Sequence, residues 1–253
     1  TVRAETACGL LEPFQQAAEL ERREQLPDLG HVPCADTAIL GLDLEIITEN
    51  HLDHSFGLLN TGKADLLAIG LTVNATRRQE VLFTDPIDET RQVLVQRKPK
   101  AWRSLSPDAL EFRLVRNQLD LAGKTVYVQK GSSHVERLHS LAREIGDSID
   151  IVEVPFEAET LIKNLNDGEI DYVVCDENIA LVNATYYPDI DVETPVSFTQ
   201  SLAWAVRKQG SDKLAEELNK WISGFKSTTS YSLLYSKYFR NARSSQMVKS
   251  DFY

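Results

Sequence analysis

The chain has 253 residues, of which 42% are hydrophobic and 26% are charged, a composition typical of a globular protein large enough to form two domains. Its 27 basic and 38 acidic residues give a net charge of −11, which argues against nucleic acid and anionic membranes as partners. No apolar run approaches the ~20 residues of a membrane span and no signal peptide is present, so we expect either a cytosolic chain or one whose signal was removed.

Residues 1–41 are the least readable part of the chain. Helically spaced apolar residues and many charges predict an amphipathic helix over Leu10 to Leu26, and prolines and a glycine predict a loop over Pro27 to Cys34. The three cysteines have no metal-binding spacing. Cys175 lies in an apolar run and is predicted to be a buried thiol, whereas the sequence leaves open whether Cys8 and Cys34 pair.

Strands and helices alternate from residue 42 onward. The pattern of Leu42 to Ile46 predicts a strand, and Asn50 to Asn60 predicts a helix that is closed by Gly62. His51 and His54 belong to no HExxH motif, and we interpret them as surface residues rather than metal ligands.

The stretch 63–86 is the most informative part of the sequence. It opens with the apolar run Leu66 to Ile69, which predicts a buried strand that ends at Gly70. The polar loop after it contains Thr72, Asn74, Arg77 and Arg78. An arginine in such a loop can grip a carboxylate with its planar fork, although composition alone favours ordinary exposed arginines.

This stretch resembles family-3 periplasmic solute-binding proteins, the binders of polar amino acids. The resemblance is carried by Ala64-Asp65, Gly70-Leu71-Thr72, Arg77 and Phe83-Thr84-Asp85-Pro86. It implies that Thr72 and Arg77 bind the α-carboxylate of the ligand, with Gly70 and Asn74 beside them. Asn74 stands where a Thr or Ser is usual, and Arg78 is one position out of register. The family's first strand has no counterpart that we identify within residues 1–41.

A second group of candidate residues follows the next strand, predicted at Gly123 to Val128. Gly131, Ser132 and Ser133 begin a helix there, and Ser133 with Glu136 fits a capping box. The N-terminus of a helix favours an anion, but capping alone explains these residues equally well. The resemblance implies that they complete the carboxylate site from a second lobe.

An acid ends a later predicted strand, Ile170 to Cys175. Asp176 lies where ligands bind in open α/β sheets, although it could simply cap the helix that follows. The resemblance implies that Asp176 binds the α-amino group of the ligand. The runs Asp176-Glu177-Asn178-Ile179-Ala180, Tyr187-Pro188, Ala203-Trp204-Ala205-Val206-Arg207-Lys208 and Trp221-Ile222 narrow the resemblance to the solute-binding module of the membrane-bound lytic murein transglycosylase F group.

We therefore predict an α/β chain with the two-lobed, type II fold of periplasmic binding proteins, with a ligand cleft between lobes joined by two hinge crossings. Lobe 1 is predicted over 1–95 plus 197–240 and lobe 2 over 96–196, with the two crossings expected near Arg91 to Gln96 and near Val192 to Trp204. Residues 241–253 form a C-terminal tail. In the resembled enzymes a catalytic lysozyme-like domain follows at this point, so we expect none of their activity from this chain.

The predicted function is a periplasmic module that binds an amino acid or a small cell-wall peptide and regulates a transglycosylase F-like protein. Membrane anchoring is left open. The alternatives are the amino-acid-binding subunit of an ABC importer, a degenerate module that docks a protein or cell-wall partner, and an enzyme in its own right. We expect a monomer without catalytic residues, cofactor, metal or nucleic-acid partner.

Overall fold

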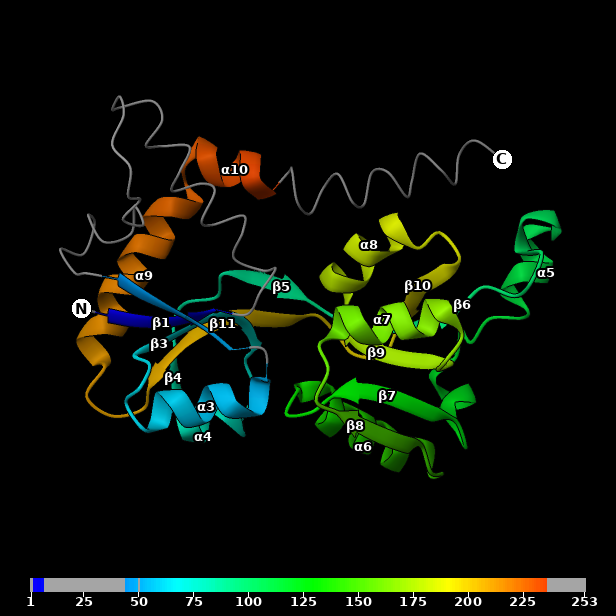
Figure 1. Ribbon diagram of the computed structural model, residues 1–253, viewed down its shortest axis with the longest axis horizontal. Helices are drawn as coiled ribbons and strands as arrows, with labels where there is room; N and C mark the ends of the chain where they lie inside the picture. Colours follow the sequence, from blue (N-terminus) through cyan, green and yellow to red (C-terminus); the bar gives the residue numbers. More distant parts are fainter. Residues whose placement is uncertain (1, 7–43, 50, 236–253) are drawn as a thin grey trace. The chain divides into compact units, whose positions relative to one another are not determined.

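The computed structural model describes residues 2–6, 44–49 and 51–235, which form two compact units (Figure 1). Of the described residues, those up to Glu89 and those from Gln200 onward form unit 1, and Thr90–Thr199 form unit 2. The helix and loop predicted within residues 10–34 lie outside the described residues, as does the tail 241–253. The chain passes from one unit to the other at 89/90 and at 199/200. The second position lies within the predicted range Val192 to Trp204, and the first lies just before Arg91 to Gln96, a strand that pairs within unit 2.

Unit 1 is a six-stranded mixed sheet with helices on both faces. Its elements are β1 (Val2–Thr6), β2 (Leu44–Thr48), α3 (Leu52–Asn60), β3 (Leu66–Thr72), α4 (Arg77–Glu80), β4 (Val81–Phe83), β5 (Asp88–Thr90), β11 (Gln200–Arg207), α9 (Asp212–Lys226) and α10 (Thr229–Tyr235). The strand order is β2-β1-β3-β11-β4, with β5 paired to β11. Strand β1 is parallel to both β2 and β3, so the first strand that we failed to identify lies at the N-terminus of the chain.

Strand β3 shows why its sequence reads as an unbroken apolar run. Leu66 and Ala68 pack towards α9 on one face, whereas Leu67, Ile69 and Leu71 pack with Leu59 of α3 on the other. Successive side chains of a strand point to opposite faces, and both faces of this strand are covered by helices, so all four positions of the run 66–69 are apolar.

Unit 2 is a five-stranded sheet with the order β10-β6-β9-β7-β8. Its elements are β6 (Gln92–Arg97), η1 (Trp102–Ser104), α5 (Pro107–Glu111), η2 (Gln118–Leu121), β7 (Thr125–Gln129), α6 (Ser133–Ile145), β8 (Asp150–Val154), α7 (Ala158–Asp167), β9 (Tyr172–Asp176), α8 (Glu177–Tyr186) and β10 (Ile190–Pro195). Helices α7 and α8 cover one face of the sheet and α6 covers the other. Cys175 lies in the core between the sheet and α7, which confirms the predicted buried thiol, and burial raises its pKa well above the usual value.

A buried ion pair fastens the segment between β6 and β7 to β10. The Nη1 and Nη2 atoms of Arg116 donate to the two carboxylate oxygens of Asp191 at 2.5 and 2.9 Å. Asp191 is only 4% exposed, and it also accepts a hydrogen bond from Gln96 at 3.2 Å. Arg116 also binds Glu111 and thereby lowers the pKa of that carboxyl.

We expect Arg116→Ala to lower the free energy of unfolding by about 2–4 kcal/mol, because it leaves the buried carboxylate of Asp191 without its cation. Urea unfolding followed by circular dichroism measures this loss. Arg103→Ala is the matched control: its pair with Asp189 is exposed on both sides and should contribute about 1 kcal/mol or less. Equal small losses in both variants would contradict the expected role of the Arg116–Asp191 pair.

Candidate functional site

The predicted arginine of unit 1 lies just beyond the carboxyl end of β3. Arg77 begins the short helix α4, is only 8% exposed, and donates from Nη1 to the backbone oxygen of Thr72 at 3.2 Å. Its guanidinium lies over the ring of Phe56 in α3, 5.6 Å from the centroid. The neighbouring Arg78 is exposed, as the register predicted. The fork of Arg77 is therefore held in a fixed position, which lowers the entropy lost when it binds a planar anion.

The other two predicted residues of this loop have structural roles of their own. The Asn74 side-chain oxygen accepts the backbone N–H of Arg77 at 2.8 Å and so shapes the turn that presents the arginine. Gly70 does not end the strand as expected, because β3 continues to Thr72. A Cβ at Gly70 would lie 3.4 Å from the side chain of Leu202 on the adjacent strand, so this glycine faces another side chain at contact distance.

Three helices of unit 2 begin at one edge of its sheet. Strands β7, β8 and β9 run parallel, and α6, α7 and α8 follow them with Ser132, Glu157 and Asp176 as N-caps. None of these three side chains makes a capping hydrogen bond. Adjacent strands are about 4.8 Å apart, so the three helix starts lie close together. Their polar side chains are therefore not used to cap the helices that they begin.

The predicted glycine–serine turn lies at the start of α6. Gly131 has a φ of +75°, a conformation that favours glycine, and it leads directly into Ser132. The N-cap is Ser132 and not Ser133, so the predicted capping box is wrong: the Ser133 hydroxyl instead accepts a hydrogen bond from the buried Gln92 at 3.2 Å. Ser132 is 8% exposed, and its hydroxyl has no hydrogen-bond partner among the described residues.

Asp176 faces His134 across this edge rather than capping α8. His134 Nε2 lies 3.3 Å from Asp176 Oδ1, and the two side chains are 8% and 13% exposed. The other ring nitrogen of His134, Nδ1, is buried without a partner in the described part of the chain. A carboxylate in this position retains hydrogen-bonding capacity for a donor.

Two glutamates add negative charge to the same edge. The Oε1 atom of Glu157 is buried, with no partner among the residues that the structure describes. Burial and the neighbouring Glu157 raise the pKa of Glu159 above its usual value. Burial is the main cause of the raised pKa of Cys175, and the negative charges of Asp176 and Glu159 raise it further. Carboxylates that are desolvated and close together favour a cation between them.

The structure groups the eight predicted residues by unit: Gly70, Thr72, Asn74 and Arg77 lie together in unit 1, and Gly131, Ser132, Ser133 and Asp176 lie together in unit 2. Sequence reasoning missed Gln92, His134 and Glu157. A glutamine that opens the apolar run 92–95 and a histidine on the apolar face of α6 were the available signals.

Within the described ranges, no helix combines the length and the apolar character needed to cross a bilayer.

Comparison with known proteins confirms the resemblances expected from the sequence. Residues 36–241 match the model of bacterial extracellular solute-binding proteins, family 3. The chain is 32% identical over 200 residues to membrane-bound lytic murein transglycosylase F of Desulfosudis oleivorans, covering 79% of this chain and 41% of that protein. The protein of the same name from Saccharophagus degradans is 33% identical over 189 residues, covering 75% and 35%. The chain therefore spans less than half the length of these curated relatives.

The fold is that of amino-acid-binding proteins. An ancestral arginine-binding protein bound to arginine matches with a TM-score of 0.71 and 24% sequence identity, over 94% of this chain and 97% of that one. This structural likeness shows the architecture, and it agrees with the two α/β units described above. The match to the family model covers most of the sequence. The chain belongs to family 3 of the bacterial extracellular solute-binding proteins.

Proposed function

We propose that this chain binds an amino acid or a small cell-wall peptide between its two units, as a periplasmic module. Arg77 and Thr72, with Gly70 and Asn74 beside them, bind the ligand carboxylate from unit 1. Gly131, Ser132 and Ser133 complete the carboxylate site from unit 2, where Asp176 binds the ammonium group. These are the eight residues that the family resemblance assigned.

The observation that carries the proposal is the opposite chemistry at the two sheet edges. Unit 1 has a nearly buried guanidinium at the carboxyl end of β3. At one sheet edge, unit 2 has Asp176, Glu157, Glu159 and a buried Ser132 hydroxyl that has no partner in the described part of the chain. A ligand with a carboxylate and an ammonium group matches both, since arginine grips carboxylates bidentately and clustered carboxylates attract a cation. A ligand that binds both units favours the state in which they close on it.

The relatives suggest what this binding is for. They bear the name of a lytic transglycosylase and are more than twice as long as the segment that they share with this chain. We infer that the chain is the regulatory module of such a protein, with a cell-wall peptide or amino acid as its signal and a lytic domain or cell-wall component as its partner. Delivery to an ABC importer is the alternative, favoured by the fold shared with an arginine-binding protein.

A thermal-shift screen of amino acids and peptidoglycan stem peptides tests the proposal. A true ligand at 100 times its Kd should stabilise the chain by about 2.7 kcal/mol, which corresponds to roughly 5–10 °C in Tm. Chromatography after prolonged incubation should recover the ligand unchanged, and purified cell wall should release no fragments. Consumption of the ligand would favour an enzyme, and the absence of any shift would favour a docking module.

A further inference from the structure

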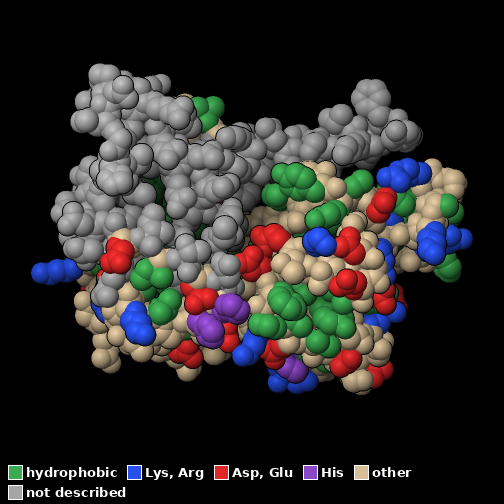
Figure 2. Space-filling view, viewed as in Figure 1, with side chains coloured by type: hydrophobic (Ala, Val, Ile, Leu, Met, Phe, Trp, Pro, Cys, Tyr) green, Lys and Arg blue, Asp and Glu red, His purple; other side chains and the backbone are tan. Residues whose placement is uncertain are grey.

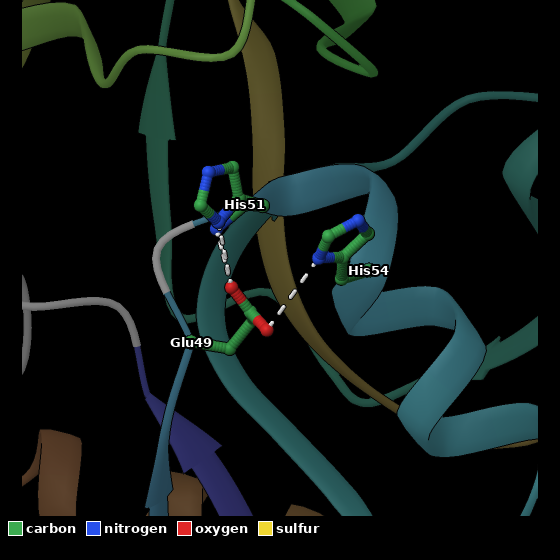
Figure 3. Close-up of side chains that lie close together, drawn as sticks. All are labelled: Glu49, His51 and His54. Atoms are coloured by element: carbon green, nitrogen blue, oxygen red, sulfur yellow. Dashed lines mark hydrogen bonds and ion pairs between the residues drawn. The ribbon is translucent and has the colours of Figure 1, made fainter.

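A carboxylate and two imidazoles converge at the start of α3 in unit 1 (Figure 3). The residues are Glu49, which follows β2, and His51 and His54, which begin the helix. Glu49 Oε1 lies 3.0 Å from His51 Nδ1, and Glu49 Oε2 lies 3.7 Å from His54 Nδ1. Within the described residues, this is the one group of three or more His, Cys, Asp or Glu side chains whose ligand atoms lie within 4.8 Å of one another.

The local backbone explains this convergence. His51 is the N-cap of α3 in an extended conformation, and its backbone N–H donates to Glu49 Oε1 at 2.9 Å, which holds the carboxylate against the helix start. His54 comes three residues later, so it lies on the same side of the first turn as His51. The two rings are 5.1 Å apart between centroids and both face Glu49, as Figure 3 shows.

The spacing of these atoms suits a metal ion. Zinc takes nitrogen and oxygen ligands at about 2.0–2.1 Å in a tetrahedron, which requires neighbouring ligand atoms to be roughly 3.3 Å apart. His51 Nδ1 lies 3.0 Å from one Glu49 oxygen and His54 Nδ1 lies 3.7 Å from the other, and one ligand atom from each residue lies within 4.8 Å of the other two, so the set must contract modestly to bind an ion. The histidine side chains are 45% and 63% exposed, so small rotations can bring all three ligand atoms to the same centre. Figure 2 shows histidine side chains at the surface of unit 1 beside acidic ones.

The donor set also indicates which metal. Imidazole suits zinc, copper and nickel, whereas calcium and magnesium prefer sites made of oxygen ligands alone. Two histidines and one glutamate form a known three-ligand zinc set that leaves a fourth position open to water or another ligand. We propose that Glu49, His51 and His54 bind one zinc-class divalent cation through the Glu49 carboxylate and the two Nδ1 atoms. His51 and His54 are exposed, as the sequence predicted, and the proposal adds a ligand role that our sequence interpretation did not give them.

The site lies at the same edge of the unit 1 sheet as the Arg77 loop. Strand β1 is parallel to both β2 and β3, so the carboxyl ends of β2 and β3 point the same way. Phe56, whose ring lies under Arg77, follows His54 by two residues in α3. A cation bound here therefore adds positive charge to the edge that carries Arg77, but its binding requires none of the eight residues proposed to hold the solute.

The test is calorimetric titration of the untagged chain, freed of metal by a chelator, with zinc chloride. We expect one zinc per chain, and we expect His51→Ala, His54→Ala and Glu49→Gln each to weaken binding by at least about tenfold. Cobalt titration should give the visible absorption of a tetrahedral site, which the three variants should lose. Calcium and magnesium at the same concentrations should give no saturable heat.

Two other histidines provide the controls. His139 is exposed on α6 of unit 2, so His139→Ala should leave zinc affinity unchanged. His31→Ala is tested beside it, because His31 is not one of the three proposed ligands. Unchanged affinity in the His51→Ala/His54→Ala double variant would overturn the proposal, as would the absence of saturable zinc binding or its loss only with His31→Ala. Circular dichroism of each variant verifies that a loss of affinity does not reflect unfolding.

Discussion

Replacing Arg77 with alanine is expected to weaken binding of the solute by about 30-fold to several thousand-fold, equivalent to roughly 2–5 kcal/mol. Arg77 is only 8% exposed, so its guanidinium is largely desolvated, and its removal would leave the carboxylate of the proposed ligand without its cation. Arg77→Lys should not restore affinity, because a single ammonium cannot reproduce the planar fork that grips both carboxylate oxygens. Titration calorimetry with a ligand found in the thermal-shift screen measures the effect.

The adjacent arginine provides the control for this prediction. Arg78 carries the same charge one residue along the chain but is exposed, so Arg78→Ala should change affinity by less than about threefold. If Arg78→Ala abolishes binding while Arg77→Ala preserves it, the register of the loop is wrong. If neither substitution matters, the solute does not bind through this loop and a docking role becomes the better interpretation.

Asp176→Asn is expected to weaken binding of the same ligand by about 30-fold or more, because it removes the charge that we propose to bind the ligand ammonium while keeping the size of the side chain. The expected loss depends on the ammonium group of the ligand. The corresponding hydroxy acid, which lacks the ammonium, should bind the original chain weakly and should lose little further affinity on Asp176→Asn. Calorimetry of both ligands with both proteins gives the coupling energy directly.

The other end of the same strand supplies a matched control. Asp171 immediately precedes β9, whereas Asp176 ends it, and the Asp171 side chain is 73% exposed and paired with Arg97. Asp171→Asn removes the same charge about 16 Å away along the strand, where salt screens its effect on the ligand. Equal losses from both variants would mean that net charge, and not a contact with Asp176, controls affinity.

Most of the local structure could be predicted from the sequence between residues 44 and 226. Apolar runs predicted the strands now seen as β3 and β9, and Gly62, which has a positive φ, marked the end of α3. These signals are local, because each depends on side chains within a few residues of one another. The failure at β1 has the same origin: five residues, Val2–Thr6, are too short a pattern to be recognised without the strands that pair with them.

The capping box at Ser133 shows where local reasoning gives a wrong answer. The sequence Ser133 to Glu136 fits that motif, but Gln92, distant in the sequence, supplies a hydrogen-bond donor to the Ser133 hydroxyl, and the helix begins one residue earlier. A motif records which contacts are possible within one segment. It carries no information on a competing partner that another strand brings to the same position.

The sequence by itself determined the alternation of strands and helices, the membership of the family and the buried thiol of Cys175. Only the tertiary structure decided that Ser132, Glu157 and Asp176 begin three helices at one sheet edge, and that His134 faces Asp176 from 42 residues away. The physical reason is that the strand order β10-β6-β9-β7-β8 does not follow the chain. Hydrophobic periodicity fixes which face of each strand is buried, but the choice of neighbouring strand depends on packing between segments far apart in the sequence.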